Sequence, residues 1–326
     1  MARAPMYAKI KRSILDQIEQ GLYPEGARLT PEVELAAQFG VSRPTVRQAI
    51  LELVREGVVA RRRGQGTVVL HRRAKPGRPV TGGASVRLTE VVVDLLTTIE
   101  SANREAIGRA AEAVLETIVR DRLIHVAGTG HGLALVLEAF YRPGGLANIN
   151  PVWDPAMLLF NGARNSTTFE RTQEVGRSLA AKAGIQPADT LVVFSQSGVN
   201  ALPIELAVAA KDAGAATIAV TSVEHSSSVP SREAQGRRLM DVTDVVIDTH
   251  VPAGDAAFVP GSGGPALAPL STIAGAHIWN LLLVAVAERA DTVGVDLPVW
   301  ISSNIAGGDR RVQALAEAYG SRIPSL

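Results

Sequence analysis

Residues 195–200 combine side chains and backbone groups suited to holding a phosphate. The hydroxyl, amide and unhindered backbone N–H groups come from Ser195, Ser197, Gly198 and Asn200. The apolar, β-branched run 191–194 precedes them and predicts a strand buried on both faces of a parallel sheet. Pro203 follows where the first turn of a helix is expected. A strand, a polar turn and a helix N-terminus in this order present N–H groups to an anion at the carboxyl edge of a sheet.

Loops with serine and glycine also occur in α/β proteins that have no phosphate site, so these residues alone leave both interpretations open. The string Ser-Gln-Ser-Gly-Val-Asn resembles the Ser-x-Ser-Gly-x-Asn/Thr signature of sugar isomerase (SIS) domains, which bind phosphosugars. Residues 128–132 follow a predicted strand at 123–127, and residues 220–222 follow another at 216–219. Both fall where that family has its other phosphate-facing loops. The resemblance covers about residues 86–326.

The resemblance implies a set of ligand-binding residues in these loops. They are Gly128, Thr129, Gly130, His131, Ser195, Ser197, Gly198, Asn200, Thr221, Ser222 and His225. For the two histidines, a local structural hydrogen bond is the alternative to sugar contact. One branch of SIS proteins shares further motifs with this chain, at 140–146, 221–226, 254–257 and 271–276. Gly132 departs from that branch, which often has serine there, so one expected hydroxyl is missing.

A catalytic pair is a second implication of the resemblance. Aldose–ketose isomerisation of a phosphosugar needs a base that moves a proton between adjacent carbons. Glu138 and His277 resemble, by position, the acid–base pair of some SIS isomerases. A solvated helix residue and an interface histidine are the alternatives. Ser271 and Thr272 are expected only to cap the last long helix. No spacing of His, Asp or Glu indicates a metal site, and no cofactor is expected.

The charge of the chain is divided unevenly between its two ends. Residues 1–78 hold 15 Lys and Arg against 7 Asp and Glu, a net charge of +8, whereas the remaining residues have a net charge of −7. A basic head on an acidic body indicates that nucleic acid binds at one end only.

The basic head has the spacing of a helix-turn-helix. Residues 7–18 carry apolar side chains at helical intervals, and Thr30 with Pro31 predicts the cap and first position of a second helix that stops at Gly40. Ser42 is placed to cap a third helix that runs to about residue 56. The basic, glycine-containing stretch 61–66 between two short apolar runs predicts a hairpin. A small solvated helical subdomain is the alternative to a DNA-binding one.

The strings at 39–50 and 62–67 closely resemble the winged helix-turn-helix of GntR-type transcription regulators. In that family the third helix enters the major groove and the glycine tip of the wing lies at the minor groove. Carried over by position, the expected DNA contacts are Thr30, Arg43, Thr45, Arg47, Arg63, Gln65 and Gly66. The chain has Leu-Thr-Pro-Glu at 29–32, where Leu-Pro-Ser-Glu is usual.

Strand and helix patterns alternate through the second part of the chain. The expected helices include two that are separated by a break near 101–103, one from Phe169 that ends before Gly184, and one near 231–240. This alternation predicts an α/β fold, a doubly wound and mainly parallel sheet of about five strands of the SIS type, preceded by the small winged helix-turn-helix domain. The expected domains are residues 1–71 for DNA binding, 72–86 as a basic flexible linker and 87–326 for phosphosugar binding.

The chain contains no cysteine, and its longest apolar run is shorter than the ~18 residues that suggest a membrane span. We therefore expect a cytoplasmic protein without a membrane partner. The sequence predicts a transcription regulator that forms a homodimer or higher homo-oligomer, binds double-stranded operator DNA and senses a phosphorylated sugar. Two alternatives remain: a phosphosugar isomerase or related lyase with an appended DNA-binding domain, and a body kept only as a dimerisation scaffold.

Overall fold

The computed structural model describes residues 6–19, 22–24, 26–55, 58–62, 66–69, 80–81, 88–260 and 264–326. The chain divides into two compact units, Met1–Ala74 and Lys75–Leu326. Each unit has a hydrophobic core of its own.

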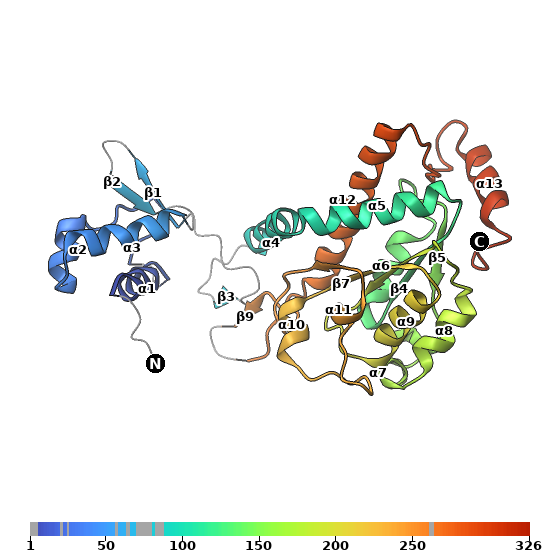
Figure 1. The fold of residues 1–326 in the computed structure, drawn as a ribbon, viewed down its shortest axis with the longest axis horizontal. Helices are drawn as coiled ribbons and strands as arrows, with labels where there is room; N and C mark the ends of the chain where they lie inside the picture. The colour runs from blue at the N-terminus through green and yellow to red at the C-terminus, as the bar shows by residue number, and fades with distance from the viewer. Residues whose placement is uncertain are drawn as a thin grey trace. The chain divides into compact units, whose positions relative to one another are not determined.

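Three helices and a hairpin form the first unit (Figure 1). Its elements are α1 (Met6–Glu19), α2 (Glu32–Phe39), α3 (Arg43–Arg55), β1 (Val59–Arg62) and β2 (Gly66–Val69). The apolar face of α1 packs with α3, where Ile14 and Val46 are fully buried. The two strands pair antiparallel, with Val59 opposite Val69 and Arg62 opposite Gly66. This is the predicted helix-turn-helix with its hairpin.

Thr30 does not cap the second helix, which corrects one expectation. Pro31 holds the cap position with φ −54° and ψ 146°, and no side chain among the described residues caps α2. The Thr30 hydroxyl is instead in a hydrogen bond of 2.5 Å with the Tyr23 hydroxyl. At the other end of α2, Gly40 adopts the left-handed conformation expected of a helix C-terminus.

A parallel sheet of five strands organises the second unit, in the order β5-β4-β6-β7-β8. Its strands are β4 (Ile124–Gly128), β5 (Ile149–Val152), β6 (Thr190–Phe194), β7 (Ala216–Thr221) and β8 (Val245–Asp248). A separate short parallel pair joins β3 (Val80–Thr81) to β9 (Phe258–Val259). The expected doubly wound fold is confirmed.

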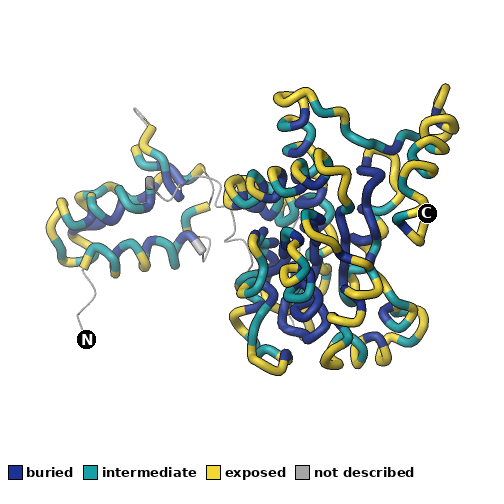
Figure 2. Tube along the Cα trace, turned by 45° about the vertical axis from the view of Figure 1, so that its right-hand side comes forward, coloured by how far each residue is buried: buried dark blue, intermediate teal, exposed yellow. Residues whose placement is uncertain are grey.

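Helices cover both faces of this sheet (Figure 1). They are α4 (Leu88–Ala102), α5 (Arg104–Val119), α6 (Leu133–Ala139), α7 (Ala163–Arg171), α8 (Val175–Ala183), α9 (Ala201–Asp212), α10 (Val223–Ser228), α11 (Leu239–Val242), α12 (Ser271–Val293) and α13 (Gly308–Tyr319), with short 3₁₀ turns at Gly130–Gly132, Pro155–Met157 and Leu159–Asn161. Along β6, Val192 and Phe194 join the core of α4, α5 and α12, whereas Leu191 and Val193 join that of α8 and α9. Every residue of β4 and β6 is accordingly buried, as the dark blue of the sheet in Figure 2 indicates.

Two predicted helices differ from the structure. The helix expected from Phe169 to Gly184 is broken, because Glu174 has φ +68° and the buried Glu205 carboxylate accepts from the N–H groups of Glu174 and Gly176 over 2.9 and 3.2 Å. This carboxylate starts α8 as a separate helix. The helix expected at 231–240 shrinks to α11, because the Glu233 side chain captures backbone N–H groups at residues 235 and 237.

The long helix α12 is apolar enough by length and composition to cross a membrane, with a mean hydropathy of 1.3 over its best window, of which 39% is buried. The longest uninterrupted apolar run of the sequence did not reveal this property of α12, because polar residues interrupt its apolar residues. In the structure α12 packs against α4, α5 and α6, and its Ile278, Leu282 and Val286 belong to the central core. It is therefore a core helix of the second unit.

Candidate functional site

The strand order places two of the predicted loops side by side. β4 has β5 on one side and β6 on the other, so the chain order reverses between β4 and β6. Gly128, the last residue of β4, lies opposite Phe194, the last residue of β6. Ligands in open α/β sheets bind in the crevice beyond the strands at such a reversal.

A cavity of about 290 Å³ opens at this edge of the sheet. It is lined by seven of the predicted ligand residues, namely Thr129, Gly130, His131, Ser195, Ser197, Asn200 and His225. Residues that the sequence prediction did not name as ligands complete the polar wall, chiefly Glu170, Gln196, Thr249, Asp255, Ser271 and Thr272. Leu135, Phe194 and Val220 add apolar surface.

The carbonyl and N–H groups of the loop after β6 differ in how they are bonded. Its carbonyls are anchored, since the N–H groups of Ser222, Arg232 and Leu239 donate to the carbonyls of residues 196, 199 and 198. By contrast, the N–H groups of residues 196–200 donate to no acceptor within the described residues. The first N–H groups of α9 lie directly beyond them. This arrangement can accept an anion.

Two glycines are required by close packing around this loop. Gly198 has φ +61°, and a Cβ there would lie 2.8 Å from the Thr221 Oγ1. At Gly132 a Cβ would lie 2.6 Å from the Phe194 carbonyl oxygen. The departure from serine at position 132 therefore lets the two neighbouring loops approach one another.

The remaining predicted ligand residues stand behind the cavity wall. Gly128 ends the fully buried strand β4. The Thr221 hydroxyl donates to the Gln196 carbonyl over 3.3 Å. The Ser222 hydroxyl donates to the Val251 carbonyl over 2.7 Å and accepts from the His225 N–H over 3.1 Å, which caps α10. These contacts position the cavity-lining loops.

Glu170, on α7, brings a half-buried carboxylate into the cavity wall. Its Oε1 accepts from Nδ2 of Asn200 over 2.7 Å, and Nη1 of Arg232 reaches Oδ1 of the same amide over 3.4 Å. Burial raises the pKa of Glu170, opposed by a hydrogen bond from Thr129 and by the nearby charges of Arg171 and Arg232. No spacing in the sequence pointed to this residue, because α7 lies between the strands and outside the three recognised loops.

Asp255 holds the beginning of α12. Its Oδ1 accepts from the N–H groups of Leu270 and Ser271 over 3.0 and 2.7 Å, and its Oδ2 accepts from the Ser271 hydroxyl over 2.6 Å. The carboxylate therefore takes the place that an anion could occupy at this helix N-terminus. The cap predicted from Ser271 is supplied by Asp255 instead, and Ser271 and Thr272 line the cavity.

Two polar atoms in the cavity wall are buried without a partner in the described part of the chain. They are Nε2 of Gln196 and Nδ1 of His225. Burial lowers the pKa of His225, opposed by the charges of Asp255 and Glu224. A neutral imidazole and a free amide can both bond sugar hydroxyls.

Glu138 and His277 lie outside the cavity lining. Glu138, on α6, forms an ion pair with Arg142 one turn further on. His277 lies on α12 with Nε2 buried and without a partner among the described residues. The carboxylates that do line the cavity are those of Glu170 and Asp255. Among the described residues, no group of three or more His, Cys, Asp or Glu could hold a metal ion.

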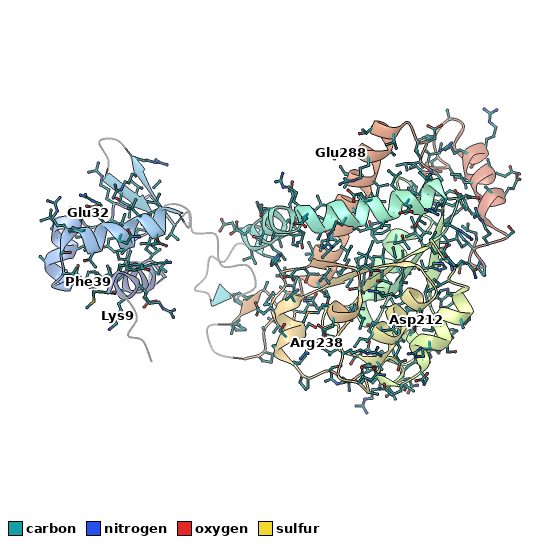
Figure 3. The ribbon with its side chains drawn as sticks, viewed as in Figure 1. Lys9, Glu32, Phe39, Asp212, Arg238 and Glu288 are labelled. Carbon is teal, nitrogen blue, oxygen red and sulfur yellow. The ribbon has the colours of Figure 1, made fainter. Side chains whose placement is uncertain are left out.

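The first unit presents a basic surface around α3 and the hairpin. Arg43 and Arg47 are exposed and Thr45 is half-buried, with its hydroxyl 2.8 Å from that of Ser42. Glu32, labelled in Figure 3, begins α2. Its carboxylate bridges Arg47 and Arg61 over 3.1 and 2.6 Å. Between these elements lies a hollow of about 570 Å³ whose lining includes Thr30, Arg62 and Gly66. The predicted contacts Arg63 and Gln65 lie outside the described residues.

Comparison with known proteins matches both units. Residues 6–69 match the family model of bacterial regulatory proteins of the gntR family, and residues 88–222 match the SIS domain. The chain is therefore a transcription regulator built from a GntR-type DNA-binding head and a SIS body. The sequence-based identification of both parts is confirmed.

Curated relatives show a family to which most of the chain is similar. The UPF0309 protein of Listeria monocytogenes serotype 4b (strain F2365) is 37% identical over 237 residues, which cover 73% of this chain and 96% of the relative. That of Geobacillus kaustophilus (strain HTA426) is 37% identical over 226 residues, covering 69% of this chain and 90% of the relative. The chain belongs to the UPF0309 family. The aligned lengths far exceed the first unit, so the match rests mainly on the SIS body.

Solved structures resemble the two parts separately. The crystal structure of the AraR DNA-binding domain with operator ORR3 is 41% identical and covers 21% of this chain and 82% of that chain, with a TM-score of 0.20. The phosphoheptose isomerase GmhA from Neisseria gonorrhoeae is 18% identical and covers 62% of this chain and 93% of that chain, with a TM-score of 0.40.

Proposed function

We propose that the SIS body binds a phosphorylated sugar in the cavity beside β4 and β6 and thereby changes the affinity of the GntR head for operator DNA. The observation that carries the proposal is the loop at 196–200. Its N–H groups donate to no acceptor within the described residues, and it lies at the point where the strand order reverses.

The phosphate would lie in this loop, against the hydroxyls of Ser195 and Ser197 and the N-terminus of α9. The start of α12 is unsuited to that role, because the Asp255 carboxylate already occupies it. The sugar would extend toward Glu170, His131 and His225, which line the same cavity. A volume of about 290 Å³ is near the lower end of the ~300–1,000 Å³ usual for ligand sites.

A short strand pairing offers a route from the cavity to the linker. Gly254 and Asp255 line the cavity, and β9 begins at Phe258, three residues further along the chain. β9 pairs with β3, which lies in the segment that leads from the head to α4. A ligand that moves the 254–255 loop therefore acts on a strand bonded to the linker.

On the DNA side, Arg43, Thr45 and Arg47 would read the major groove and Thr30 and the hairpin would contact the backbone and minor groove. A homodimer would set two heads about one helical turn apart on a palindromic operator. The proposed domains are residues 1–71, 72–86 and 87–326, and the proposed location is the cytoplasm, where operator DNA and phosphosugars meet.

Two measurements on the full chain test this function. Isothermal titration with a panel of hexose, pentose and amino-sugar phosphates should identify a ligand, and a Ser197→Trp variant should not bind it because the indole fills the cavity. Anisotropy of labelled operator should then shift with that ligand. Failure of every phosphorylated sugar to bind, or binding that Ser197→Trp leaves unchanged, would contradict the proposal.

Catalysis is a second candidate function, favoured by one observation. Glu170 is a cavity carboxylate whose pKa burial raises, as general bases that work near neutral pH require. Proton NMR of the bound phosphosugar in D₂O, followed over hours, decides between the two. If a carbon-bound proton of the ligand exchanges with deuterium and Glu170→Gln abolishes this exchange, the protein is an enzyme. If the spectra do not change, the protein only senses the ligand.

A further inference from the structure

The cavity has an unusual charge for an anion-binding site. Two carboxylates, Glu170 and Asp255, line it, and no Lys or Arg does so among the described residues. Protein charges of opposite sign to the ligand favour its binding, and charges of the same sign oppose its binding. A ligand that carried only a phosphate would therefore gain nothing from these carboxylates.

Asp255 is already satisfied by the protein. It accepts three hydrogen bonds at the start of α12, where the partial positive charge of the helix offsets the carboxylate. Glu170 is different, because its nearest hydrogen-bond partners are neutral. Asn200 donates to it over 2.7 Å, and Arg232 bonds the amide of Asn200, with no ion pair to Glu170 among the described residues. The amide thus stands between the carboxylate and the cation.

A half-buried carboxylate without a direct cationic partner suits a cationic ligand group. Burial disfavours its charged form, and an ammonium ion is the group that restores this form most effectively. A neutral hydroxyl can only donate a hydrogen bond there. The neutral donors of the 196–200 loop can hold the phosphate at the same time.

We propose that the ligand is a phosphorylated sugar with a free amino group, and that Glu170 is the specificity-determining residue that pairs with this ammonium. The inference rests on the proposed function, since it names the ligand class of the same cavity. It separates amino-sugar phosphates from their hydroxyl and N-acetyl counterparts, which lack the charge.

The pH dependence of affinity follows from the same pairing. An ammonium beside Glu170 lowers the pKa of the carboxyl in the complex relative to the free protein. Binding the amino sugar therefore releases a proton from Glu170 while pH lies between those two values, and affinity rises with pH through that window. The other titratable side chains in the cavity lining are Asp255, His131 and His225, and Arg171, Arg232 and Glu224 lie nearby. A Glu170→Gln variant removes the part of this dependence that belongs to Glu170.

The test is titration calorimetry of the full chain with matched ligands: glucosamine 6-phosphate, glucose 6-phosphate and N-acetylglucosamine 6-phosphate, with the galacto series alongside. The wild type should bind the free amine at least about tenfold more tightly than its two counterparts. In Glu170→Gln, whose amide still accepts from Asn200, this preference should disappear. Glu116→Gln, which changes an exposed carboxylate of α5 outside the cavity, should retain it.

The outcomes separate this inference from the function on which it rests. Equal affinity for glucose 6-phosphate and glucosamine 6-phosphate, or a preference that survives in Glu170→Gln, would overturn the role of Glu170 while the phosphosugar cavity stands. Failure of every phosphosugar to bind would overturn both. Circular dichroism of Glu170→Gln and its binding of glucose 6-phosphate are measured in parallel to show that the variant is folded. Glu170→Asp, which keeps the charge, should retain part of the preference.

Discussion

The Arg47 guanidinium on α3 donates to the Glu32 carboxylate on α2 over 3.1 Å. The same carboxylate accepts from Arg61 of the hairpin over 2.6 Å. The Glu32 side chain is only 18% exposed, whereas that of Arg47 is 52% exposed. One half-buried acid thus joins the two basic elements of the head and fixes the direction in which each arginine points.

Arg47→Ala should remove most of the operator affinity and leave ligand binding intact. A base-reading arginine is worth about 1–3 kcal/mol, so the dissociation constant should rise at least about fivefold. Fluorescence anisotropy measures this dissociation constant on an operator that the wild-type protein has selected from a random DNA library. Arg12→Ala, which alters an exposed arginine of α1, is the control. Unchanged operator affinity in Arg47→Ala would show that α3 does not read DNA.

Glu32→Gln should reduce the discrimination between operator and random DNA more than it reduces the affinity for DNA. Removing the negative charge favours DNA phosphates, but Arg47 and Arg61 lose the partner that orients them. The ratio of operator to random-DNA affinity should therefore fall, while binding to random DNA is equal or tighter. A variant with the wild-type ratio would show that the bridge does not position Arg47.

Gly132→Ser should destabilise the body instead of restoring a missing phosphate ligand. The added Cβ meets the Phe194 carbonyl, and a clash of this kind costs about 1–3 kcal/mol. Gly108→Ala is the matched control, since it lies within α5 near only the flexible Arg289 tip and gains helix propensity. Urea unfolding compares the two. Equal stability of Gly132→Ser and wild type would contradict the close approach of the two loops.

Glu170→Gln should stabilise the unliganded protein at neutral pH. The pKa of Glu170 is raised in the folded state above its ordinary value of 4.5, so the folded protein binds this proton more tightly than the unfolded chain does. Stability therefore falls as pH rises from the unfolded to the folded pKa and stays lower above it. The melting temperature of Glu170→Gln should exceed that of wild type at pH 7.5 by more than it does at pH 4. A difference independent of pH would contradict this assignment.

Val259→Pro should uncouple the ligand from DNA. The Phe258 N–H donates to Leu267, so the N–H of the next residue faces β3, and proline removes this donor. Ligand affinity should stay within about twofold because Val259 does not line the cavity. The effect of the ligand on operator affinity should shrink toward none. Full retention of that effect would show that the β3–β9 pair does not carry it.

Local patterns predicted most of the fold. The five strands, the break between α4 and α5 and the hairpin of the head all follow from apolar periodicity and turn residues. The sequence could not show that Asp255 caps α12 or that Glu205 starts α8, because each side chain binds a helix distant along the chain. Thr30 failed as a cap for a local reason, since Pro31 holds the cap position and the Thr30 hydroxyl bonds the Tyr23 hydroxyl.

The lining of the cavity was predicted in part. The loops at 128–132 and 195–200 were found because glycine and small hydroxyl residues after a strand have a local pattern. No local sequence pattern marks Glu170, because only the folding of α7 over the sheet edge brings this residue beside Asn200. The pair Glu138 and His277, expected from position alone, lies outside the cavity lining.

The most direct test of the central claim is the operator dissociation constant of the full chain with and without saturating phosphosugar, with saturation established by calorimetry in the same buffer. A coupling of about 1–3 kcal/mol between the two sites predicts a change of about 5–150-fold. An operator dissociation constant that stays the same while the cavity is demonstrably filled would contradict the account.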